Sequence, residues 1–145
     1  MSKKQAFDFN NLESQTYWGI VGMMTSFSEW LISTDAASKK VFEDLDAAID
    51  VNGAVDLASL ENFNMTSLLL QLENAKGKTE EEKRGIIISH LSKAGVNTNG
   101  LTISKSLIDN LVSMGGRMVT NENYVKLQQA KEAAMQREST EMIPS

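Results

Sequence analysis

The sequence predicts a mainly α-helical protein, a compact single-domain bundle of five or six helices, and three observations carry this prediction. The chain has a single proline, Pro144, so proline interrupts no helix before the last two residues. Apolar residues recur at intervals of three and four along most of the chain, and glycine and asparagine cluster between these stretches. With 145 residues, of which 41% are hydrophobic, the chain suits one domain with a continuous core.

The domain is expected to occupy residues 12–130. Residues 1–11 are expected to form a flexible N-terminus. The segment 131–145 is charged and short of large apolar side chains, which predicts a flexible C-terminal tail.

The first helix is expected from about Leu12 to Ser33. Its main apolar stripe has helical spacing and comprises Tyr17, Ile20, Val21, Met24, Phe27 and Leu31. Trp18, Met23 and Trp30 lie off this stripe, so the helix carries apolar groups on more than one side. Such a helix is either buried on several sides or meets another protein on one of them. Core packing is the plainer interpretation, and a binding face is the alternative.

The next two helices have weaker boundaries. One is expected to start at Asp35, a residue that suits the N-cap position, and to end at the Asn52-Gly53 turn. Its apolar face comprises Val41, Leu45, Ala48 and Ile49. The other is expected to open at Asp56 or Ser59 and to continue through a leucine-rich run, with Gly77 as a left-handed stop.

The fourth helix has the clearest start. Thr79 followed by three glutamates forms a capping box, with acidic side chains at the positive end of the helix dipole. The isoleucine run within Arg84–Leu91 also suits a strand, so a minor β element there is the alternative. A fifth helix is expected over Ile103–Val112, ending at the pair Gly115-Gly116, and a last one follows Thr120.

Residue chemistry argues against catalysis. The chain has no cysteine and one histidine, His90, so the usual sets of nucleophile, base and metal ligands cannot be assembled. We therefore expect no enzyme activity, no cofactor and no metal. The Gly77-Lys78-Thr79 tripeptide lacks the earlier glycine of a phosphate-binding loop, and an EF-hand-like Asp50-x-Asn52-Gly53 lacks both terminal ligands.

Charge and hydropathy limit the classes of partner that the protein is expected to bind. A formal net charge of −5 disfavours attraction to nucleic acid or to anionic lipid. No apolar run approaches the length of a signal peptide or of a membrane helix, which predicts no direct membrane insertion. The expected location is the cytoplasm, because the chain has no cysteine to form the disulfides that stabilise many proteins outside the cell. Protein partners remain, and flexible methionines such as Met23 suit surfaces that accept varied ones.

Several segments resemble a known family. Tyr17–Trp30 resembles the first helix of IcmW, the small acidic adaptor of bacterial type IVB (Dot/Icm) secretion systems. Further segments follow in the same order and lie between Lys39 and Arg117, namely Lys39–Ile49, Val55–Leu57, Leu69–Gln71, Arg84–Ile88 and Leu107–Ile108. The resemblance covers about Tyr17 to Tyr124, and total length agrees.

The resemblance implies a non-catalytic adaptor or secretion chaperone. Such a protein would pair with a second small acidic adaptor, dock on a coupling ATPase and present exported substrates to the secretion machinery. The residues expected to contact protein partners are Trp18, Met23, Phe27, Trp30 and Arg117. The alternative is a structural or assembly subunit, of a phage or a secretion apparatus, that acts as a homo-oligomer.

Overall fold

The computed structural model describes residues 9–50, 60 and 62–142, and these residues form helices and connecting turns. In chain order the helices are η1 (Leu12–Ser14), α1 (Tyr17–Thr25), α2 (Phe27–Thr34), α3 (Ala36–Asp50), α4 (Met65–Asn74), α5 (Glu80–Lys93), α6 (Lys105–Thr120) and α7 (Glu122–Met142). The prediction of a mainly α bundle is confirmed. The minor β element is wrong, because Arg84–Leu91 is part of α5.

Side-chain caps begin most of these helices. The hydroxyl of Thr79 accepts the backbone N–H of Glu82 at 3.1 Å, as the capping box predicts. Ser104 caps α6 in the same way, and the side chain of Asn64 accepts the N–H of Ser67 at the start of α4. Each cap satisfies a backbone donor that a helix N-terminus leaves free.

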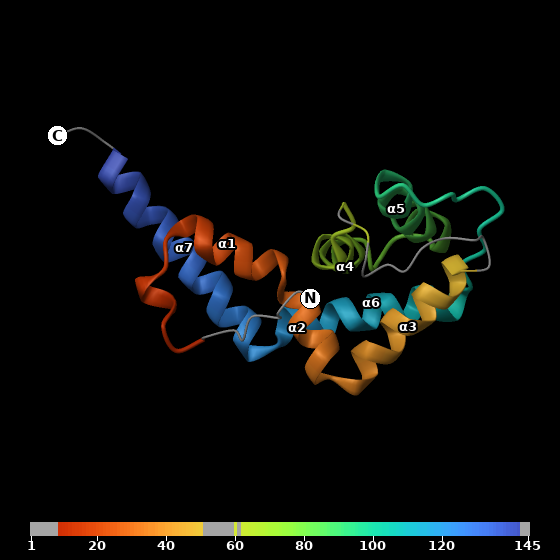
Figure 1. The fold of residues 1–145 in the computed structure, drawn as a ribbon, viewed down its shortest axis with the longest axis horizontal. Helices are drawn as coiled ribbons and strands as arrows, with labels where there is room; N and C mark the ends of the chain where they lie inside the picture. Colours follow the sequence, from red (N-terminus) through yellow and green to blue (C-terminus); the bar gives the residue numbers. More distant parts are fainter. Residues whose placement is uncertain (1–8, 51–59, 61, 143–145) are drawn as a thin grey trace.

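The helices are arranged in two parts that meet near α2 (Figure 1). In the larger part α6 packs between α3 and α4, and α5 lies on α4. In the other part α7 packs along α1 and reaches η1. The two helices run in opposite directions, since the start of α1 meets the C-terminal end of α7.

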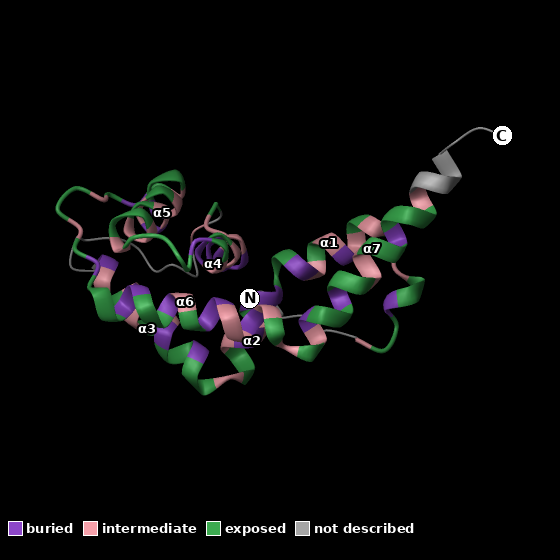
Figure 2. Cartoon of the chain, turned by 180° about the vertical axis from the view of Figure 1, so that it is seen from behind, coloured by how far each residue is buried: buried purple, intermediate pink, exposed green. Residues whose placement is uncertain are grey.

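One apolar core runs through both parts. Buried residues face inward along every helix from α1 to α7, and exposed residues cover the outer faces (Figure 2). Side chains with no exposed surface include Ile20, Phe27, Leu45, Leu69, Leu91, Leu111 and Leu127. The central residues of the apolar stripes expected for the first two helices therefore face this core.

The first helix is divided where one continuous helix is expected. α1 ends at Thr25, Ser26 with φ of −97° and ψ of 0° interrupts the helix, and α2 begins at the next residue. The apolar stripe continues across the break, because Met24, Phe27 and Leu31 are all buried. Periodicity alone therefore cannot locate this break.

Two glycine assignments are wrong. The pair Gly115-Gly116 does not end the fifth helix, since α6 runs through it to Thr120. A Cβ atom on Gly115 would lie 2.8 Å from the backbone oxygen of Leu69, so this glycine permits a close approach of α6 to α4. The left-handed glycines of the described residues are Gly95 and Gly100, and Gly77 is not among them.

The remaining boundaries differ at the ends of the elements. The start expected for the third helix, at Asp56 or Ser59, lies outside the described residues, and α4 begins at Met65. The segment from Lys131 continues α7 as a helix as far as Met142. It does so because Ala134 is fully buried and the residues beyond it contact the start of α1.

Candidate protein-binding surface

Trp18 is the most exposed large apolar side chain of the described residues. Its exposed fraction is 72%, and its ring meets the ring of Tyr17 edge-on at 5.0 Å. The first turn of α1 places it there, because Tyr17 and Ile20 turn toward the molecule whereas Trp18, on another side of the helix, turns away. A tryptophan this exposed keeps a large apolar area available for contact.

Phe27, in contrast to Trp18, is fully buried. It has no exposed surface and forms the centre of an aromatic cluster in which Trp30 lies 5.0 Å and Tyr124 lies 5.2 Å away, between ring centroids. Burial raises the pKa of the Tyr124 phenol above its usual value. Phe27 therefore has a core position, and a partner cannot reach it in this conformation.

Trp30 and Met23 are both partly buried and pack against the core. The ring of Trp30 contacts two phenylalanines that also contact each other, with centroid distances of 5.4 Å to Phe9, 5.0 Å to Phe27 and 6.2 Å between Phe9 and Phe27. Trp30 thus joins the N-terminal segment to α2, and only part of its surface is available for contact.

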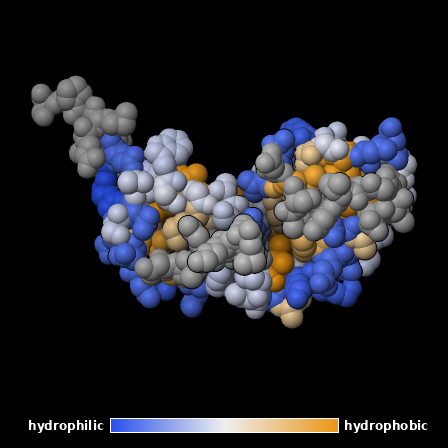
Figure 3. Space-filling view, viewed as in Figure 1, coloured by the Kyte–Doolittle hydropathy of each residue, from blue (hydrophilic) through white to orange (hydrophobic). Residues whose placement is uncertain are grey.

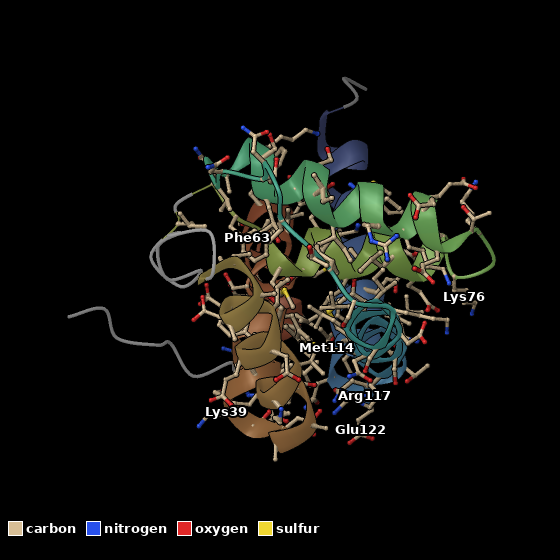
Figure 4. The ribbon with its side chains drawn as sticks, turned by 90° about the vertical axis from the view of Figure 1, so that its right-hand side faces the viewer. Lys39, Phe63, Lys76, Met114, Arg117 and Glu122 are labelled. Carbon is tan, nitrogen blue, oxygen red and sulfur yellow. The ribbon has the colours of Figure 1, made fainter. Side chains whose placement is uncertain are left out.

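Arg117 lies on α6 against the junction of α2 and α3. It donates to the hydroxyls of Ser113 at 3.1 Å and Ser38 at 3.3 Å, and its Nε lies 3.6 Å from Oδ2 of Asp35. The Nε atom is shielded from solvent and has no hydrogen-bond partner among the described residues. Figure 4 shows Arg117 at the edge of the molecule near Glu122, whereas Met114 on the same helix points into the interior.

Asp35 organises this junction. It ends α2 and directly precedes α3, so its carboxylate lies at the start of α3, where the backbone N–H groups of Ala37 and Ser38 help to lower its pKa. The buried hydroxyl of Ser38 donates to the carboxylate at 2.5 Å and, together with Arg117, holds the pKa of Asp35 below its usual value. The N-cap expected at Asp35 is confirmed, and the network gives Arg117 a structural role beside any contact with a partner.

The structure therefore separates the five expected contact residues. Trp18 is at the N-terminal end of α1 and Met23 near its C-terminal end, Phe27 and Trp30 are in the aromatic cluster, and Arg117 is on α6. Met135 on α7 is 48% exposed and is one of the flexible methionines, but it is not among the five expected contact residues. Met135 lies in the segment 131–145, which the sequence assigns to a flexible tail rather than to a helix that could present it.

Few side chains in the described part of the chain are placed to bind a metal ion or to take part in catalysis. It holds no group of three or more acidic, histidine or cysteine side chains that could bind a metal ion. His90 is partly buried, and burial with nearby Lys93 lowers its pKa. An open hollow of 390 Å³ lies between α3 and the start of α6, where Asp44 is already paired with Lys40 at 2.7 Å.

No described helix combines the length and apolar character that crossing a membrane requires. Comparison of the chain with known protein families, with curated proteins and with solved structures gave no match.

Proposed function

We propose that the protein is a non-catalytic protein-binding adaptor or chaperone and that Trp18 is the centre of its contact surface. The observation that carries the proposal is the exposure of a tryptophan on a regular helix, where its side chain is not part of the core. Tryptophan is among the residues that contribute most to binding at protein interfaces. Water contact of so large an apolar side chain is unfavourable until a partner covers it.

The surroundings of Trp18 suit such a contact. The edge-on contact with Tyr17 restrains its ring, so less conformational entropy is lost on binding. The start of α1 is fixed in turn, because Glu138 accepts the Tyr17 N–H at 2.5 Å. A rigid aromatic group on a fixed helix is the kind of anchor that fits a pocket on a partner.

The resemblance to the IcmW family indicates the cellular system in which the adaptor works. On that basis the adaptor works in a bacterial type IVB secretion system in the cytoplasm. Its partners are a second small acidic adaptor, a coupling ATPase and exported substrate proteins. The acidic charge of the chain and its residue chemistry are compatible with this role.

The test is co-purification of partners with the tagged protein from its native host, using Trp18→Ala. Recovery of the partners is expected to fall at least tenfold while the melting temperature stays within about 1–2 °C of the parent, because the side chain makes little contact with the core. Val125→Ala is the matched control, since this residue is also exposed but lies on α7. Equal recovery with Trp18→Ala and the parent would remove Trp18 from the proposal.

The competing proposal is a structural or assembly subunit that acts as a homo-oligomer. Light scattering on the purified protein separates the two. A closed homo-oligomer that Trp18→Ala dissociates would assign the exposed side chain to self-assembly, and the adaptor proposal would be wrong.

A further inference from the structure

Two helices far apart in the sequence form one unit, which we call the arm. It consists of α1 and α7, with η1 at its tip. Glu138 on α7 accepts the N–H of Tyr17 at the start of α1. Arg137 donates to the backbone oxygens of Glu13 at 2.9 Å and Gln15 at 3.2 Å. These bonds join the tip of the arm across more than 120 residues of sequence, and α1 packs chiefly on α7 along the remaining length.

Each helix of the arm is joined to the rest of the molecule by one non-helical residue. Ser26 stands between α1 and α2. Asn121 stands between α6 and α7, and its φ of −63° is helical whereas its ψ of 132° is extended. Rotation about a few bonds at such residues redirects a helix without disturbing the helix itself.

The two joints lie close together in space. Phe27 follows Ser26 directly, Tyr124 is three residues after Asn121, and their rings are 5.2 Å apart. Both connections therefore leave the arm at the same end. Two connections at one end define a single hinge, whereas connections at opposite ends would prevent rotation.

The other side of the arm is more weakly attached. α1 packs lightly on α4, and the surface is hollowed between the arm and the pair formed by α4 and α5 (Figure 3). By contrast, α2 is fixed to α4 by a buried hydrogen bond of 3.1 Å from the N–H of Ser28 to the hydroxyl of Thr66. The firm attachment thus begins immediately after the joint at Ser26.

From these observations we propose that the arm rotates as one body about Ser26 and Asn121 and so changes the width of the hollow beside α4. This property belongs to the fold and goes beyond the proposed function, because it holds with or without a partner. Trp18 travels with the arm, so the rotation also moves the exposed tryptophan relative to α4 and α5.

The experiment measures distances between spin labels on pairs of introduced cysteines, which the cysteine-free chain makes specific. The cross pair is Ala133→Cys on α7 with Ser89→Cys on α5. The arm pair is Glu13→Cys with Lys126→Cys, and the body pair is Lys39→Cys with Ser89→Cys. All five positions are exposed, so labelling leaves the core intact.

The expected result is a broad or two-component distance distribution for the cross pair and a narrow one for the arm and body pairs. Asn121→Ala is expected to shift the cross pair to longer distances, because straightening the joint between α6 and α7 carries α7 away from α5. A cross pair as narrow as both controls would show a rigid molecule and overturn the proposal. An arm pair that broadens together with the cross pair would show that α1 and α7 separate, which also overturns it.

Discussion

Gly115 on α6 faces the backbone of Leu69 on α4 so closely that a Cβ atom at position 115 would lie 2.8 Å from the Leu69 carbonyl oxygen. A side chain of any size at this position forces the two helices apart. Because α6 packs between α3 and α4, a shift of α6 disturbs the contacts of both neighbours.

We expect Gly115→Ala to lower the free energy of unfolding by about 1–3 kcal/mol, the usual cost of overpacking a core. Urea denaturation followed by circular dichroism measures the change. Gly116→Ala is the matched control, because its Cβ would meet the Glu73 carboxylate at an ordinary 3.7 Å and alanine favours a helix over glycine. An equal loss of stability in both variants would contradict the role of the close approach.

Phe27→Ala is expected to lower the free energy of unfolding by about 3–5 kcal/mol, because it removes a fully buried ring from the aromatic cluster. Trp18→Ala is expected to change it by no more than about 0.5 kcal/mol, since that side chain is mostly exposed. The comparison uses the same denaturation experiment. A large loss from Trp18→Ala would mean that its ring is covered in solution.

The sequence predicts the helices well where a single local pattern decides. Thr79 caps α5 because the hydroxyl and the N–H of Glu82 are three residues apart and need no distant partner. The inward positions Val41, Leu45 and Ile49 of α3 follow from periodicity for the same reason. The break at Ser26 is different, since the apolar stripe continues through it and the chain on either side remains helical.

The candidate site is less predictable because it depends on contacts between distant residues. Phe27 lies on the apolar stripe and is buried, but the stripe does not separate the residues off it, since Trp30 packs against the core whereas Trp18 is mostly exposed. The pairing of Arg117 with Asp35 joins residues 82 positions apart. Gly115 reads as a helix stop until α4 is placed beside it.

Thr79→Ala is expected to destabilise the protein by about 1 kcal/mol, because the N–H of Glu82 loses its acceptor at the start of α5. Thr79→Ser keeps the hydroxyl and is expected to retain most of the stability. Thermal unfolding of the three proteins measures the difference. If the serine variant were as unstable as the alanine variant, the hydroxyl would have no part in the cap.

The Asp35 network predicts a pH dependence with a definite sign. The hydrogen bond from Ser38 and the charge of Arg117 lower the pKa of Asp35 from its ordinary value of 3.8. A carboxylate with a lowered pKa in the folded state stabilises the fold above its unfolded pKa, and this contribution is lost as the pH falls through the folded pKa. Asp35→Asn removes the ionisable group and therefore this pH dependence.

The stability difference between the parent and Asp35→Asn is therefore expected to stay constant from about pH 7 to pH 5 and to shrink below about pH 4. Urea denaturation at a series of pH values measures it. Ser38→Ala removes the largest cause of the shift, so the Asp35 pKa, followed by NMR of its carboxyl carbon, is expected to rise toward its ordinary value. An unchanged pKa in Ser38→Ala would assign the shift to Arg117 and the helix backbone instead, because these groups remain in the variant.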